Sequence, residues 1–244
     1  MDWRDDGIVL SLRKHGESSV ILHLLTREHG RHAGLVRGGN SQKQRGILQS
    51  GNEVSAVWRA RLEEHLGNIT VELLDSHSAR VLSDPDRLAA MSSACALIDA
   101  CLPEREPHAE LFASLRELLT LLPGEGWEAA YVGWELSLLG ELGFGLDLES
   151  CAATGVTEDL AYVSPKSGRA VSAAAGAAYR EKLLVLPRFL TAQAPVETGT
   201  LEKGALSDGL RLTGYFLERH MLAPHGKLLP DARDRLGERW RRGT

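Results

Sequence analysis

The sequence has few cysteines, few aromatic residues and no long apolar run. Three cysteines among 244 residues are too few, and odd in number, for a disulfide framework, which indicates a reducing compartment. Without a run of about 18 apolar residues, no membrane-spanning helix is expected. The acidic start MDWRDDGIVL also lacks the basic and apolar regions of a signal peptide. We therefore expect a soluble, cytoplasmic protein.

Catalytic and cofactor motifs are missing as well. We find no GxxxxGK[ST] loop, no GxGxxG after a strand, no GxSxG and no HExxH. Residues Cys151 to Gly155 (CAATG) have the outline of a zinc knuckle, but Thr154 stands at the second ligand position and the partner pair is absent. One thiolate cannot form a tetrahedral sulfur site. We expect no metal, no cofactor, no catalytic residue and no enzymatic activity; a hydrolase is a distant alternative.

The spacing of apolar residues divides the chain into two parts, one with the alternation of strands and one with the period of helices. Residues 1–80 contain five short runs of alternating apolar and polar residues, bounded by glycine-containing turns. The segment 40–46 between the third and fourth runs looks like a polar loop. Five strands in such a short stretch favour a small closed barrel, because closure removes exposed sheet edges. An OB-type barrel fits the strand count, and an SH3-like barrel is the alternative.

From residue 81 to 244 the period is helical. Helices are predicted over about 85–102, 107–122, 126–142 and 205–222, with a last basic helix after Pro230 and a loop over 191–203. A hairpin is expected at 161–171, inside a glycine-interrupted stretch. The fold class is therefore α+β: an OB-type barrel over 1–80, then a mostly helical domain over 81–244.

The net charge is 28 − 33 = −5, which excludes a polybasic nucleic-acid binder but not a local basic face. Residues 1–80 carry 11 basic and 10 acidic side chains (+1) and the remainder 17 and 23 (−6). Alternation directs Arg13, Arg59 and Arg61 away from the core. The candidate nucleic-acid contacts of the barrel are Arg13, Lys14, Arg31, Arg37, Lys43, Arg45, Arg59 and Arg61.

A solvated surface is the alternative, since acidic residues nearly cancel the charge of this region. Aromatic residues are scarce before residue 80: Trp3 and Trp58 are the two present, and Trp58 shares the apolar face. Any nucleic-acid binding should therefore depend on phosphates, ignore base sequence and weaken with salt.

Four strings in this order and spacing closely resemble the bacterial RecO family of DNA repair proteins: GIVLSLRKHGESS, LTREHGRHAGLVRGG, LQSGNEV and LGFGLDLESCAATG. The resemblance covers about residues 5–222. It implies an N-terminal OB-fold, a helical C-terminal domain, binding of single- and double-stranded DNA, and annealing of complementary strands at the nucleoid. The partners it implies are RecR, the C-terminal tail of single-strand-binding protein, RecA and, in some contexts, RecF.

The resemblance also assigns residues. Arg37 and Gly38 match the family's strand-end motif, and the basic loop behind them matches its DNA-contacting segment. Residues 145–172 resemble the metal-free form of the family's zinc ribbon, which makes Lys166 and Arg169 secondary DNA contacts. No motif assigns contacts for the acidic tail of the partner protein; from the basic residues of the helical domain we name Arg211, Arg219 and Arg233 as candidates. The alternative function is a protein-interaction adaptor that reaches DNA only through partners.

Overall fold

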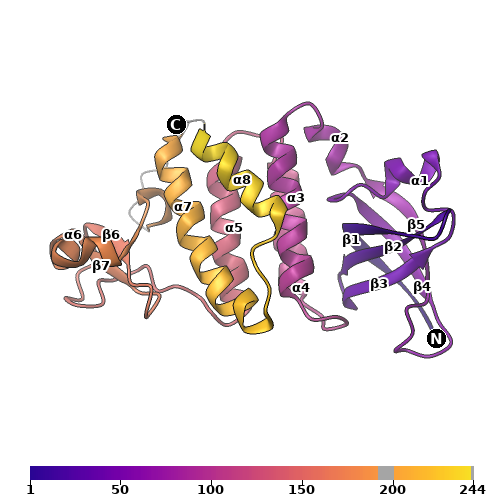
Figure 1. Cartoon of the computed structure of the whole chain (residues 1–244), viewed down its shortest axis with the longest axis horizontal. Coiled ribbons are helices and arrows are strands. Elements are labelled where there is room, and N and C mark those ends of the chain that lie inside the picture. Colours follow the sequence, from indigo (N-terminus) through magenta and orange to yellow (C-terminus); the bar gives the residue numbers. More distant parts are fainter. Residues whose placement is uncertain (192–200, 243–244) are drawn as a thin grey trace. The chain divides into compact units, whose positions relative to one another are not determined.

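The computed structural model describes residues 1–191 and 201–242 (Figure 1). The chain divides into two compact units, Met1–Pro123 and a second that begins at Gly124. The boundary thus lies about forty residues beyond the end of the predicted barrel, because two helices pack with the strands rather than with the later helices. None of the described helices is long and apolar enough to cross a membrane.

The first unit contains the barrel that the sequence predicts. Its strands are β1 (Asp2–His15), β2 (Ser19–Thr26), β3 (Gly30–Val36), β4 (Glu53–Arg59) and β5 (Asn68–Asp75), closed in the order β1-β2-β3-β5-β4. The long β1 pairs with β4 along its first half and with β2 along its second half. Closure between β3 and β5 rests on a single pairing, Leu35 with Asn68. The OB-type, α+β fold is confirmed.

Alternation places the barrel core where expected, with one exception in β1. Val54, Ala56 and Trp58 of β4 are buried between more exposed neighbours. In β1, however, Val9 and Leu10 are both buried, because a bulge between Val9 and Ser11 shifts the register. Leu12 is opposite the core residue Leu22, so it lies on the core side of the sheet as alternation predicts, although it is 41% exposed.

The segment predicted as a polar loop is partly helical. Residues Gln42–Ile47 form a short helix, α1, and the Arg45 amide bonds back to the Ser41 carbonyl at 3.0 Å. The prediction of a loop over 40–46 was wrong for these residues. Gln, Lys, Gln and Arg in succession are good helix formers, and one turn needs no apolar stripe to reveal it.

Three further helices complete the first unit: α2 (His77–Val81), α3 (Pro85–Cys101) and α4 (Ala109–Leu121). Asp84 caps α3 by accepting hydrogen bonds from the amides of Asp86 and Arg87, and Pro85 occupies the first turn, as the sequence predicts. Figure 1 shows α3 and α4 beside one end of the strands.

A polar network fastens α3 to the barrel. The Asp99 carboxylate accepts a 2.7 Å hydrogen bond from Ser11 Oγ and lies 2.8 Å from His23 Nδ1 and 3.1 Å from Arg31 Nη1. Burial alone would raise the pKa of Asp99, but hydrogen bonds from His23 and Ser11, with the charges of His23 and Arg31, outweigh burial and lower it. The carboxylate therefore stays ionised and joins β1, β2 and β3 to one helix.

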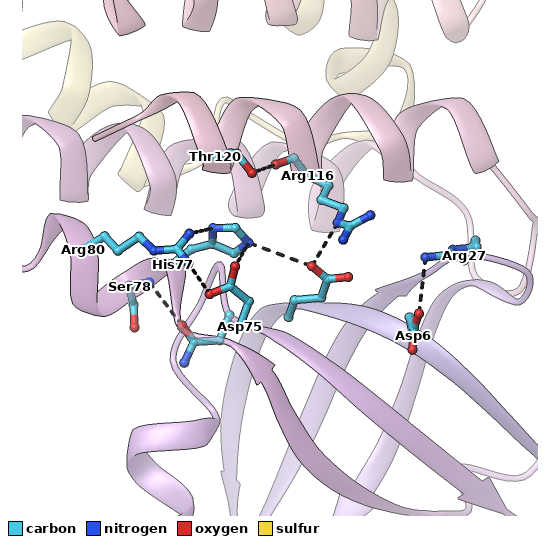
Figure 2. A network of polar contacts seen from close by, with 10 residues as sticks. Asp6, Arg27, Asp75, His77, Ser78, Arg80, Arg116 and Thr120 are labelled. Atoms are coloured by element: carbon cyan, nitrogen blue, oxygen red, sulfur yellow. Dashed lines mark hydrogen bonds and ion pairs between the residues drawn. The ribbon is translucent and has the colours of Figure 1, made fainter. Parts of the chain in front are cut away.

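A second network lies where β4 and β5 meet α2 and α4 (Figure 2). Arg116 Nε donates to the buried Glu53 carboxylate at 3.0 Å, and Arg80 Nη2 donates to Asp75 at 2.6 Å. His77 lies between them, 4.0 Å from Glu53 and 3.8 Å from Asp75. Burial lowers the pKa of His77 despite these carboxylates. The network compensates the buried charge of Glu53.

The second unit contains several helices and a small three-stranded sheet. Its helices are α5 (Trp127–Glu141), α6 (Ala173–Gly176), η1 (Ala177–Lys182), η2 (Arg188–Leu190), α7 (Lys203–Phe216), the π-helical turn η3 (Leu217–Leu222), η4 (Ala223–His225) and α8 (Asp231–Arg242). Its strands are β6 (Leu160–Val163), β7 (Ala170–Ser172) and β8 (Leu184–Val185), in the order β7-β6-β8. The predicted hairpin and last helix are confirmed; most of the predicted loop 191–203 lies outside the described residues.

A buried ion pair holds three helices of this unit together. Arg233 of α8 donates to both carboxylate oxygens of Glu135 of α5, one of them at 2.8 Å, and to the Leu210 carbonyl at 2.8 Å. Thr213 of α7 donates to the same carboxylate. Because Glu135 is fully buried and Arg233 nearly so, each charge depends on the other for compensation.

Candidate nucleic-acid interface

The basic side chains of residues 1–80 separate into two groups. Four of them are ion-paired with carboxylates: Arg4 with Glu72, Arg27 with Asp6, Arg31 with Asp99 and Glu104, and Arg80 with Asp75. The other seven have no carboxylate within ion-pair distance among the described residues: Arg13, Lys14, Arg37, Lys43, Arg45, Arg59 and Arg61. All seven are exposed. We call these seven side chains the unpaired basic set.

Five members of this set come from neighbouring parts of the barrel. Lys14 of β1 is opposite Val20 of β2, which is opposite Val36 of β3, and Arg37 follows directly. With about 4.8 Å between neighbouring strands, the backbones of Lys14 and Arg37 lie about 10 Å apart. Arg13 is on the outward face, as alternation predicts. Lys43 and Arg45 follow on α1, after a tight connection.

Hydrogen bonds brace that connection. Gly38 has φ of 67°, and the Ser41 amide bonds to its carbonyl at 3.0 Å. The Asn40 amide bonds to the Ser18 carbonyl at 3.0 Å, which fastens the connection to the β1–β2 turn. Arg45 donates to the carbonyl and side-chain oxygens of Asn40 at 3.1 and 3.0 Å. The Arg45 guanidinium therefore stiffens the loop, while Arg37 and Lys43 keep their hydrogen-bonding capacity for a ligand.

Arg59 and Arg61 lie on another part of the barrel surface, at the end of β4 and in the connection to β5. Arg59, at the end of β4, is opposite Asp2 of β1 and Asn68 of β5. Asn68 in turn pairs with Leu35, two residues before Arg37. Arg61 follows the strand in the β4–β5 connection. These two cations therefore continue the basic surface past the junction of β3 and β5.

Arg31 departs from the sequence prediction. Its side chain is 13% exposed, and it donates to the Leu102 carbonyl at 2.9 Å besides pairing with Asp99 and Glu104. A guanidinium with this many protein partners has little capacity left for phosphate. Arg31 instead joins β3 to α3 through its ion pair with Asp99. Asn40, which the sequence analysis did not single out, is instead the residue that orders the basic loop; its place after two glycines was the available signal.

The tryptophans of the barrel are covered by other rings. Trp3 stacks on His29 at 4.4 Å and on Trp58 at 5.8 Å, and His32 meets both indoles edge-on at 5.0 Å. Burial, with the nearby positive charges of Arg105 and His29, lowers the pKa of His32 to about 4. With both faces of Trp3 occupied, the surface offers charge rather than stacking to a nucleic acid.

In the second unit, the zinc-knuckle remnant is held by hydrogen bonds. Cys151 Sγ accepts the Ser172 amide at 3.3 Å. Burial would raise the pKa of this thiol, but hydrogen bonds from Ser172 and Thr154 outweigh it and lower the pKa to about 6. Within the described ranges, no three His, Cys, Asp or Glu side chains gather as a metal site. Nearby, Arg169 pairs with Asp147 at 3.0 Å, whereas Lys166 is exposed in the β6–β7 turn.

The three candidates for the acidic tail differ in exposure and in their partners. Arg211 is exposed and pairs with Asp208, and Arg219 lies against the Tyr215 ring, 6.0 Å from its centroid. Arg233 is buried against Glu135. Arg233 cannot meet a partner without breaking that pair, so the structure assigns it to the core of the second unit.

Comparisons with known proteins agree over nearly the whole chain. A family model described as "Recombination protein O N terminal" matches residues 1–77, and one described as "Recombination protein O C terminal" matches residues 82–229. A protein of Rhodospirillum centenum named "DNA repair protein RecO" is 53% identical over 244 residues, covering 99% of this chain and 96% of the relative. A protein of the same name from Rhodospirillum rubrum is 52% identical over 248 residues, covering 99% and 97%. A further one, from Cereibacter sphaeroides, is 49% identical and covers 98% of both chains.

Proposed function

This chain belongs to the RecO family of DNA repair proteins, and we propose that within DNA repair and recombination it is a non-enzymatic mediator that binds DNA and anneals complementary single strands. It uses no cofactor and forms no covalent intermediate. Its first ligand is the sugar–phosphate backbone of single-stranded DNA, and duplex DNA binds through the same charges. It acts in the cytoplasm, at the nucleoid.

The unpaired basic set of the barrel carries this proposal. A cation already paired with a carboxylate gains little from a phosphate, because one ion pair replaces another. An exposed cation without an acidic partner releases the counterions condensed on DNA when it binds, which is the main source of sequence-independent affinity. Arg13, Lys14, Arg37 and Lys43 come from neighbouring strand ends and one short helix, so a single strand can contact several of them at once.

Annealing follows from charge neutralisation. Two single strands repel through their phosphates, and cations that bind one strand reduce this repulsion. Because the barrel indoles are covered by other rings, the bases of a bound strand are not taken up by stacking there. The bases stay available to a complementary strand, and pairing proceeds without a chemical step.

The proposed role in recombination depends on partner proteins as well as on DNA binding and annealing. We propose that the protein acts with RecR, in some contexts with RecF, to load RecA onto strands coated by single-strand-binding protein. The acidic tail of that protein would meet exposed cations of the second unit, among them Arg211 and Arg219. Both have weak local contacts that a stronger acidic ligand can displace.

The test measures fluorescence anisotropy of a labelled oligo-dT strand with the purified protein at several salt concentrations. We expect tight binding at low salt and a steep negative slope of log affinity against log salt. Replacing Arg37, Lys43 and Arg45 together by Ala should weaken binding and flatten the slope by about 1.4 units, at about 0.7 for each of the phosphate contacts of Arg37 and Lys43 with a single strand.

The matched control replaces Arg4, Arg27 and Arg80 by Ala, which also removes three positive charges from the barrel unit. These three are already paired with carboxylates, so we expect the salt slope to change by less than half as much. Equal losses in the two triple variants would contradict the assignment of the site. Absence of oligo-dT binding at low salt by the unmodified protein would overturn direct DNA binding and favour the adaptor that reaches DNA through partners.

A further inference from the structure

Tyr179 is the most exposed tyrosine side chain among the described residues, at 62%, and the function proposed for the barrel does not use it. It lies in η1, the short 3-10 helix between α6 and β8 in the second unit. Its ring makes no contact with another described ring and its hydroxyl has no described hydrogen-bond partner. The ring is therefore open to solvent and available to stack on a planar ligand.

The strand register places a lysine from a distant turn near this segment. β8 is antiparallel to β6, with Val163 opposite Leu184. The β6–β7 turn, which carries Lys166, leaves the sheet just after Val163. Lys182 enters the sheet just before Leu184. Lys166 and Lys182 therefore lie at the same end of the sheet, and Tyr179 and Arg180 precede Lys182 by no more than one turn of the 3-10 helix η1.

The cations around Tyr179 are also unpaired. Lys166, Arg180 and Lys182 are exposed and have no carboxylate within ion-pair distance among the described residues. Arg169 of the same turn differs, because it is paired with Asp147. Glu181 is the one acidic side chain within η1, so the local balance is positive. Residues 177–182 also line a shallow hollow of about 360 Å³.

We propose that Tyr179, Arg180, Lys182 and Lys166 form a second binding site for single-stranded nucleic acid. A base stacks on the Tyr179 ring, and the three cations contact the flanking phosphates. Every base has a π-face, so such a site tolerates any sequence, and it needs an unpaired base because duplex bases are covered by their neighbours. This site selects single strands, which the barrel charges alone do not do.

The proposal rests on the proposed DNA binding, and the test separates the two. Binding of labelled oligo-dT and of a labelled duplex of equal length is measured for the full chain and for Tyr179→Ala and Tyr179→Phe. We expect Tyr179→Ala to lose affinity for oligo-dT about five-fold or more, the low end of the loss when one stacked base is removed. Affinity for the duplex should change less than two-fold. Tyr179→Phe keeps the ring and should bind oligo-dT like the unmodified protein.

The same substitutions in the Arg37, Lys43, Arg45 triple-Ala background isolate the second site. There, the residual preference for a single strand over duplex should disappear with Tyr179→Ala. The control is Leu228→Ala, which removes an even more exposed apolar side chain (76%) from the same unit and should leave both affinities unchanged. Unchanged melting temperatures show that the variants are folded.

Equal losses for single strand and duplex with Tyr179→Ala would overturn stacking at this site. No loss at all, with the barrel triple variant impaired, would overturn the second site and leave the proposed function intact. Absence of DNA binding by the unmodified protein would instead overturn the proposed function itself.

Discussion

Arg31 of β3 and Asp99 of α3 are 68 residues apart in the sequence and 3.1 Å apart in the structure. Their ion pair is mostly buried and shares the Asp99 carboxylate with Ser11 and His23. It therefore joins three strands of the barrel to the helix that follows it. Arg37, six residues further along the same part of the chain, is exposed and has no such partner. Two arginines only six residues apart thus have different tasks.

This contrast gives a first prediction. Arg31→Ala should lower the free energy of unfolding by about 2–3 kcal/mol, because the mostly buried Asp99 carboxylate loses the guanidinium that pairs with it. Arg37→Ala, at an exposed position, should change it by less than about 0.5 kcal/mol. Conversely, Arg37→Ala should reduce the salt slope of oligo-dT binding, while folded Arg31→Ala keeps it. Urea denaturation and anisotropy measure the two effects. A stable Arg31→Ala variant that has lost DNA affinity would contradict the assignment.

Sequence patterns predicted the barrel because alternation is local: each strand shows its buried and exposed faces within seven or eight residues. Capping signals worked for α3 for the same reason. The helix α1 was missed since one turn has too few residues to show a period. Arg31 and Arg233 were predicted as ligand contacts because a sequence displays a charge but not its partner. Asp99 is 68 residues from Arg31, and Glu135 is 98 residues from Arg233. Tyr179 had no motif around it, and its exposure is a property of the fold.

A second prediction concerns pH. Burial lowers the pKa of His32 to about 4 from the usual 6.5, so between these values the unfolded chain binds a proton that the folded chain does not. Stability should therefore fall as the pH drops from 6.5 towards 4, by up to about 3 kcal/mol from this residue. His77, whose pKa burial also lowers, acts in the same direction.

His32→Phe tests this dependence, because it keeps an aromatic ring in contact with Trp3 and Trp58 and cannot titrate. We expect a shallower fall of stability with acidification in the variant than in the unmodified protein. Hydrogen exchange of the β1 and β4 amides, measured between pH 7 and pH 4.5 and corrected for the intrinsic exchange rate, reports on the barrel alone. Identical pH dependence in the two proteins would show that His32 does not carry the effect.

A third prediction concerns the interior of the second unit. Arg233→Met leaves Glu135 buried without its cation and should cost about 3–5 kcal/mol of stability. Adding Glu135→Leu removes the buried carboxylate that has lost its cation, and the double variant should regain most of the lost stability. The control is Arg211→Met, whose exposed pair with Asp208 should contribute less than about 1 kcal/mol. Additive losses for Arg233→Met and Glu135→Leu in urea denaturation would contradict a coupled buried pair.

The last prediction concerns annealing itself. Two complementary oligonucleotides, one with a fluorophore and one with a quencher, should pair faster with the protein present, and no nucleotide should be needed. The acceleration should fall as salt rises, because salt ions replace the protein cations at the phosphates. The Arg37, Lys43, Arg45 triple-Ala variant should anneal more slowly at a concentration where it still binds both strands. If this variant anneals as fast as the unmodified protein at equal occupancy, neutralisation by the unpaired basic set is not the cause of annealing. The Arg4, Arg27, Arg80 triple variant, which loses the same charge from paired positions, should retain most of the acceleration.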